Sequence, residues 1–315
     1  MALPACQKEH AVRIILFDVE HGFCAFIRTP TGHTILIDCG KGSNFSPTEY
    51  LLRNEICVPL TKLIVSHAHE DHIEDFPRVS ARLNPSILLA LNLNWNLIKE
   101  KSGASSHESL DAYVAGKDAK FTGGWVPDPN YGMSLQSFHL EPNRAQQISG
   151  SITSAVNNCS IVNIVSFSGT KYAPKFVFGG DMEEAGWNEL LATRPDFREA
   201  VAGTWFYFAS HHGHSSGFST KLYDAMGKPV LNLISVRHND ESRDSRYRSD
   251  EFSGGWYVGG EERKMLSTTC DGSIFIDVNA EGLPAVTTRF LPDNLEQPKS
   301  AALMTLREIL RRIEP

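Results

Sequence analysis

The stretch Lys62-Leu63-Ile64-Val65-Ser66-His67-Ala68-His69-Glu70-Asp71-His72 runs from an apolar segment into four side chains that can bind metal. His67 and His69 stand two positions apart, so in an extended segment they project to the same side. Asp71 and His72 fall where the chain is expected to turn into a helix, and they can face a second ion. The spacing therefore predicts two adjacent metal ions. A polar loop that is merely rich in histidine is the alternative interpretation.

Further metal-competent residues follow three other apolar runs. They are Asp38 after residues 33–37, Asp181 after residues 175–180, and the pair His211 and His212 after residues 204–210. The run before Asp181 ends in two glycines, which let the backbone approach an ion closely. One such aspartate alone is usually a turn or a helix cap. Because open sheets gather their sites at the carboxyl ends of strands, their common context indicates one shared site.

This order of residues resembles that of the metallo-β-lactamase superfamily, over most of the chain. Its five ordered motifs match Asp38, then His67, His69, Asp71 and His72, then a third region, then Asp181, and then His211. A narrower resemblance is to the hydrolase domain of ComEC-like competence proteins. It is carried by residues 17–22, 157–162, 179–181, 210–215 and 266–274. The resemblance implies an α/β fold, the αββα sandwich, with the metals at one edge.

The resemblance also implies a role for each residue. His67 and His69 are expected to bind a first metal, whereas Asp71, His72 and His211 bind a second and Asp181 bridges the two. Asp38 is expected to orient one of these metal ligands without binding the metal itself. The residues expected to act on substrate are Asp71, His212 and His214, with further contacts to ligands or substrate from Asp38, Asn157, Asn158, Ser160, Arg237 and His238.

Two segments depart from the superfamily pattern. Most members carry a histidine in the third motif, where this chain has Asn157 and Asn158. Asparagine is a poorer ligand than imidazole, so the first metal is expected to be weakly held or absent. A turn before a strand is the alternative interpretation, and His139 is an upstream substitute. Residues 237–248 replace a short family segment and leave the substrate open; a self-neutralising loop is the favoured interpretation of this arginine-rich run.

The expected chemistry follows from the ligands. Two cations a few ångströms apart lower the pKa of a bound water and can hold a hydroxide at neutral pH. No G-x-S-x-G motif offers a serine nucleophile. The candidate ligands supply nitrogen and oxygen only, which suits zinc or manganese, with two ions expected.

Hydrolysis of phosphodiesters in DNA or RNA is the first functional hypothesis, because of the ComEC-like resemblance. The net charge of −7 argues against a long basic track on duplex nucleic acid. A phosphodiesterase for a cyclic or small nucleotide is the second hypothesis, and hydrolysis of another ester, lactone or β-lactam is the third. A non-catalytic binding module with a degenerate metal site is the fourth.

Size and composition fit one domain over residues 1–315. Residues 92–150 are expected to form an insertion, and residues 300–313 a C-terminal capping helix. No apolar stretch reaches transmembrane length, and the six cysteines are scattered, so a cytoplasmic protein with no membrane contact is expected. The pattern predicts strands over 12–19, 24–29, 33–38 and 229–235, and helices over 46–54, 72–83, 108–120, 183–193 and 218–226.

Overall fold

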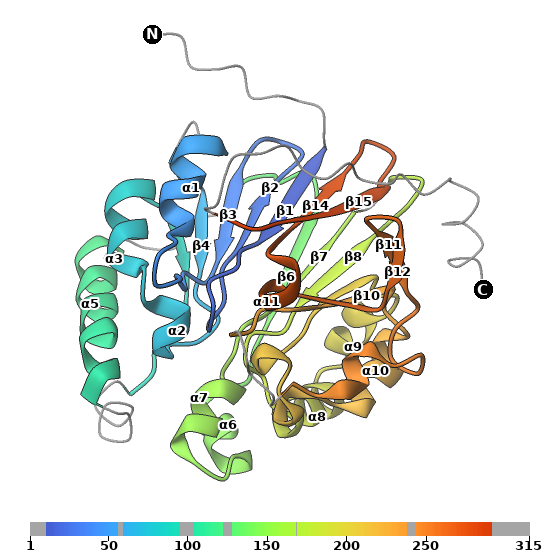
Figure 1. The fold of residues 1–315 in the computed structure, drawn as a ribbon. Helices are drawn as coiled ribbons and strands as arrows, with labels where there is room; N and C mark the ends of the chain where they lie inside the picture. Colours follow the sequence, from blue (N-terminus) through green and yellow to red (C-terminus); the bar gives the residue numbers. More distant parts are fainter. Residues whose placement is uncertain are drawn as a thin grey trace, which may run out of the picture.

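The computed structural model describes residues 11–55, 59–94, 104–121, 128–167, 169–237 and 243–291. Two β-sheets pack face to face, and helices cover the outer face of each (Figure 1). The chain therefore has the predicted αββα layering.

Within the described ranges the first sheet has the order β15-β14-β1-β2-β3-β4-β5 and the second has the order β13-β10-β9-β8-β7-β6. The first sheet comprises β1 (Val12–Leu16), β2 (Ala25–Arg28), β3 (Thr34–Ile37), β4 (Lys62–Ile64), β5 (Ile87–Leu89), β14 (Ser273–Val278) and β15 (Pro284–Arg289). The second comprises β6 (Ser134–Phe138), β7 (Val162–Ser166), β8 (Lys175–Phe178), β9 (Phe206–Phe208), β10 (Leu231–Ile234) and β13 (Met265–Ser267). A separate ribbon pairs β11 (Trp256–Val258) with β12 (Glu261–Arg263).

The helices divide between the two outer faces. The first sheet is covered by α1 (Pro47–Asn54), α2 (Glu70–Ile73), α3 (Phe76–Arg78), the π-helical η1 (Val79–Leu83) and α5 (Ala104–Lys120). The second is covered by α6 (Pro142–Ile148), α8 (Glu184–Thr193), α9 (Pro195–Val201) and α10 (Thr220–Met226). Shorter pieces are α7 (Ile152–Asn158), α11 (Thr268–Asp271), η2 (His211–Gly213), η3 (Ser215–Gly217) and η4 (Ser245–Arg248).

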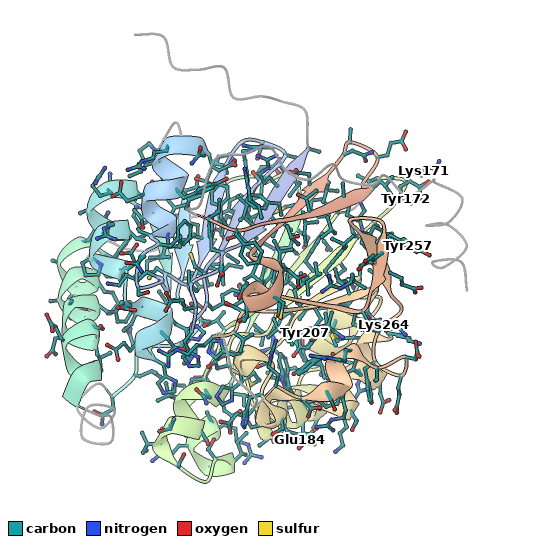
Figure 2. All side chains as sticks on the ribbon, viewed as in Figure 1. Lys171, Tyr172, Glu184, Tyr207, Tyr257 and Lys264 are labelled. Carbon is teal, nitrogen blue, oxygen red and sulfur yellow. The ribbon has the colours of Figure 1, made fainter. Side chains whose placement is uncertain are left out.

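Successive side chains of a strand point alternately into the core between the sheets and into the layer under the helices. Phe206 and Phe208 of β9 lie in the core between the sheets, because successive strand side chains point to opposite faces. Tyr207 lies between them in sequence and packs in the layer under the helices (Figure 2). Phe178 of β8 stacks on Phe208 with ring centroids 4.0 Å apart, which joins neighbouring strands across the middle of the sandwich.

Parallel strand pairs bring the chemistry to one edge. β3 pairs with β4 in parallel, and β8 pairs with β9 in parallel. Parallel neighbours end at the same side of a sheet, so the segments that follow these strands lie together. Asp38 follows β3, His67 follows β4, Asp181 follows β8 and His212 follows β9.

Most expected elements are present within a few residues of their predicted bounds, including the antiparallel β1-β2-β3 opening. The helix expected over 72–83 is wrong in form, because it starts at Glu70 and is broken into three pieces. The break lies at Asp75, whose carboxylate accepts a 2.7 Å hydrogen bond from Thr48 and whose N–H donates to the carbonyl of Cys39. These contacts replace the helical hydrogen-bond pattern.

The region 92–150 contributes to the layers of the sandwich. Strand β6 pairs antiparallel with β7, and Leu110 and Tyr113 of α5 are buried under the first sheet. The capping helix expected over 300–313 and the candidate residue His238 lie wholly outside the described residues.

The described residues also bear on the expectations about membrane contact and about the cysteines. In the part of the chain that is described, no helix is both long enough and apolar enough to cross a lipid bilayer. Cys24, Cys39, Cys159 and Cys270 are free thiols. Burial raises the pKa of Cys24 and Cys39 well above its usual range, so both behave as core residues.

Candidate metal centre

Sharp turns after the strands shape the centre. Asp38, His211 and His212 have positive φ angles of 59°, 50° and 52°, which are uncommon for residues other than glycine. Gly180 has φ of 54°, and a Cβ at this position would lie 2.8 Å from the Cβ of Ser160. Backbone strain of this kind persists where the surrounding structure holds it, and it gathers at functional sites.

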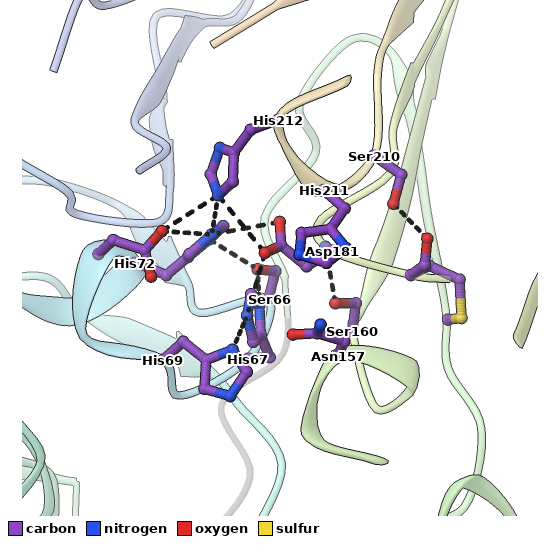
Figure 3. Close-up of polar contacts among 12 residues, drawn as sticks. Ser66, His67, His69, His72, Asn157, Ser160, Asp181, Ser210, His211 and His212 are labelled. Carbon is purple, nitrogen blue, oxygen red and sulfur yellow. Dashed lines mark hydrogen bonds and ion pairs between the residues drawn. The ribbon is translucent and has the colours of Figure 1, made fainter. Parts of the chain in front are cut away.

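One group of side chains that could hold a metal ion, here called the second site, consists of Asp71, His72, His212 and Asp181. His212 Nε2 lies 3.1 Å from Asp71 Oδ2 and 3.4 Å from Asp181 Oδ2. His72 Nε2 lies 3.3 Å from Asp181 Oδ1 and 3.4 Å from His212 Nε2 (Figure 3). Two imidazole nitrogens and two carboxylates thus face one point.

The first site is built around His67, with His69 and Asp181 as the partners that the sequence resemblance implies. Among the described residues, the ligand atoms of His67, His72 and Asp181 also lie within 4.8 Å of one another, so His72 stands between the two sites. His67 Nε2 lies 3.1 Å from His69 Nδ1 and 3.7 Å from Asp181 Oδ2. Asp181 therefore contacts both sites, with Oδ1 toward His72 and Oδ2 toward His67 and His212. A carboxylate in this position can bridge two ions.

These separations are of the size expected for ligands that share one cation. Two ligands held at 2.0–2.1 Å in tetrahedral geometry lie roughly 3.3 Å apart. The ring nitrogens of His72 and His212 are 3.4 Å apart, and those of His67 and His69 are 3.1 Å apart. The donor set of nitrogen and carboxylate oxygen suits zinc or manganese.

Hydrogen-bonding partners on Nδ1 orient three of the four histidines of the two sites, namely His67, His72 and His212. His72 Nδ1 lies 2.8 Å from Asp38 Oδ2, and His212 Nδ1 lies 3.1 Å from the carbonyl oxygen of Ser235. Ser66 Oγ is 3.1 Å from His67 Nδ1. Since a carbonyl or carboxylate only accepts, Nδ1 of His72 and of His212 carries the proton and Nε2 is left to face the site. Metal-binding histidines use the same arrangement.

Burial and the neighbouring carboxylates shift the pKa values of the four histidines in two directions. Burial disfavours the imidazolium of His212, but the carboxylates of Asp181 and Asp71 outweigh burial and raise its pKa to about 10. Burial also opposes a charge on His72, whose pKa is raised well above its usual value by Asp181, Asp71 and Asp38. Burial lowers the pKa of His67 and His69. Two histidines are thus cationic at neutral pH in the metal-free protein, and two are neutral.

The third-motif segment forms the end of α7. Asn157 donates from Nδ2 to Glu183 Oε1 at 2.9 Å, and Asn158 bonds Ser149 Oγ and the backbone N–H of Glu183. Ser160 Oγ accepts the N–H of Asp181 at 2.9 Å. Asn157 and Asn158 are helical rather than in a turn before the strand, and Ser160 holds the backbone of Asp181.

His211 and His214, two of the remaining histidine candidates, lie beside the two sites. His211 Nδ1 contacts Ser216 Oγ at 2.7 Å and lies 3.9 Å from Glu183 Oε1. His214 contacts the same Ser216 hydroxyl at 2.9 Å. His139 lies 3.1 Å from the carbonyl of Leu140, through Nδ1. The geometry thus favours His212 over His211 as the residue facing Asp71.

Sequence reasoning assigned no role to His21. Its Nε2 lies 3.6 Å from Asp71 Oδ2, and its ring centroid is 4.7 Å from that of His212. With these two residues it forms a group that could hold a metal ion. The available signal was its place shortly after an apolar strand near the start of the chain, the same context that singled out Asp38.

A cleft of about 710 Å³ is lined by Asp71 of the second site and by His69 of the first. Its polar lining includes His21, Lys41, His69, Glu70, Asp71 and Arg237. The candidate Arg237 therefore lies at the cleft, while Lys41 is paired with Glu74 at 3.2 Å. In the nearby arginine-rich run, Arg246 is paired with Asp244, as expected of a self-neutralising loop.

No family model matches the sequence, and no curated protein matches it. The fold is similar to three solved structures. They are a long-form RNase Z from yeast (11% identity, 87% of this chain, 42% of that chain, TM-score 0.42), the metallo-β-lactamase SMB-1 (13%, 62%, 79%, 0.34), and the metallo hydrolase Igni18 from Ignicoccus hospitalis (15%, 74%, 87%, 0.40). The chain spans 42% of the length of the yeast RNase Z. Similarity at this level shows the fold alone.

Proposed function

We propose that this protein is a metal-dependent hydrolase that cleaves phosphodiester bonds. The observation that carries the proposal is the pair of ligand sets joined by Asp181, with Oδ1 toward His72 and Oδ2 toward His67. When bound, two divalent cations would activate a water molecule and neutralise charge on the phosphoryl oxygens.

The chain's own residues hold and orient these groups. Asp38 fixes the ring of His72, and the carbonyl of Ser235 fixes that of His212. We assign His212 to the second site in place of His211, because His212 contacts both Asp71 and Asp181. Substitution of His212 by alanine should then lower metal content more than substitution of His211.

DNA or RNA is the substrate we propose first. Support comes from the ComEC-like resemblance at residues 157–162 and 210–215. Arg237 at the cleft offers a guanidinium for a phosphate group. The overall charge of −7 favours a short single strand over a long duplex.

A cyclic or small nucleotide is the second candidate, and the cleft favours it. A volume of about 710 Å³ lies within the usual size of small-molecule sites. Glu20, Glu70 and Glu74 line its wall, and acidic groups there disfavour a polyanion more than a single nucleotide.

The test combines metal content with a substrate panel. Purified protein loaded with zinc or manganese should bind about two ions per chain and cleave single-stranded DNA, RNA or a cyclic nucleotide. His69→Ala and Asp181→Ala should each lower the rate by several orders of magnitude, on the scale of metal-activated water. His33→Ala, at the opposite end of β3, is the matched control and should keep full activity.

The panel also separates the alternatives. Cleavage of a cyclic nucleotide alone would favour the second candidate, and turnover of lactones or β-lactams alone would defeat both. Two bound ions with no turnover of any substrate would identify a non-catalytic metal-binding module.

A further inference from the structure

One buried polar atom near the first site has no partner in the described residues. It is the side-chain oxygen Oδ1 of Asn157, whose side chain is almost completely buried. Buried carbonyl oxygens are nearly always hydrogen-bonded, and an exception indicates a water, an ion or a functional constraint. This oxygen therefore requires an explanation.

The orientation of the Asn157 side-chain amide is fixed by the hydrogen bond of its nitrogen. Nδ2 donates to the carboxylate of Glu183 at 2.9 Å. A carboxylate only accepts hydrogen bonds, so the NH₂ group must face Glu183 and the oxygen must point away from it. Figure 3 shows this oxygen directed toward the side where His67 and His69 lie.

The backbone holds the end of α7 against the metal-binding turn. The N–H of Ile161 donates to the carbonyl of Ser66 at 2.9 Å, directly before His67. Ser160 accepts the N–H of Asp181, and its own N–H donates to the carbonyl of Asn157 at 2.9 Å. The residues that directly follow Asn157 are thus hydrogen-bonded to the two turns that carry the first-site ligands.

We propose that Asn157 Oδ1 is the fourth ligand of the first site, with His67, His69 and Asp181. This inference rests on the proposed dinuclear site. An amide oxygen is a neutral, hard donor, so it favours manganese relative to the preference of a third imidazole, which suits zinc. The first site should therefore bind manganese and zinc with more similar affinity than a site with three imidazoles.

The test is a metal-binding measurement on five forms of the full chain, the unaltered protein and four variants including His211→Ala, with manganese and zinc followed separately by calorimetry. Asn157→Leu keeps the side-chain size and removes the oxygen, so the first-site dissociation constant should rise at least tenfold while the second site is unchanged. Asn157→His should raise the zinc-to-manganese affinity ratio of the first site about tenfold. Asn158→Leu is the control, because both polar atoms of Asn158 are already hydrogen-bonded.

Each outcome decides the inference. Unchanged first-site dissociation constants in folded Asn157→Leu would overturn the inference about Asn157. Loss of the first-site ion in His211→Ala, together with its retention in Asn157→Leu, would also overturn it. If Asn157→Leu does not fold, an unchanged ratio in Asn157→His overturns it. Saturation of the unaltered protein at one ion would defeat the dinuclear proposal itself, which keeps the two failures distinct.

Discussion

At the scale of single residues, the centre consists of rings aimed by their partners. His72 is held by the buried carboxylate of Asp38, and His212 by a backbone carbonyl. Each ring thereby presents Nε2 to Asp181 without rotating. The residues behind the ligands should accordingly control metal affinity almost as strongly as the ligands.

Asp38→Asn tests this control. The amide can still accept from Nδ1 of His72, but the negative charge that raises the basicity of the ring is lost. We expect metal affinity at the second site to fall 10–100-fold, the usual effect of such partners. Calorimetric titration measures it, and circular dichroism checks the fold. An unchanged affinity would show that Asp38 only shapes the turn after β3.

His21→Gln tests the residue that the sequence did not reveal. His21 lies 3.6 Å from Asp71 and at the cleft. If it assists the second site, the variant should lose about tenfold in second-site affinity or in turnover and keep the first site intact. His33→Ala is again the control. Equal binding and equal turnover in His21→Gln would remove it from the centre.

At the scale of elements, the sequence predicted what depends on local pattern. The apolar runs before His67 and Asp181 identified β4 and β8, and Ser46 before a proline identified the start of α1. It did not predict the break at Asp75, which depends on contacts from Thr48 and Cys39 far away in sequence. Which of two adjacent histidines faces the site depends on their positive φ angles, which no periodicity encodes.

Gly180→Ala tests the turn after β8. Gly180 and Gly203 both have positive φ, of 54° and 73°, but only Gly180 is crowded, by Ser160 at 2.8 Å. Gly203→Ala should cost about 1–2 kcal/mol of stability from backbone strain alone. Gly180→Ala should cost more and also displace Asp181, so metal binding should weaken. Denaturant unfolding and metal titration compare the pair; equal losses with full metal binding in both would contradict a special role for this turn.

At the scale of the whole molecule, the sandwich brings together residues from two sheets. Asp38, His67 and His72 follow strands of the first sheet, whereas Asp181 and His212 follow strands of the second. Metal binding therefore joins both halves of the fold. We expect the metal-free protein to unfold at lower temperature, since ions bound only by the folded state stabilise it by mass action.

Proton release on metal binding tests the electrostatics of the assembled centre. In the metal-free protein the pKa of His212 is raised to about 10, against burial, by Asp181 and Asp71, and the pKa of His72 is also raised. Both rings are therefore protonated at pH 7 and must each lose a proton to bind a cation, whereas burial already keeps His67 and His69 neutral. Loading both sites at pH 7 should release at least two protons per chain. The release should fall as the pH rises through about 10, where His212 becomes neutral without metal. Calorimetry in two buffers of different ionisation enthalpy counts these protons. Binding without proton release at pH 7 would show that His72 and His212 either are neutral in the metal-free protein or do not bind the ions.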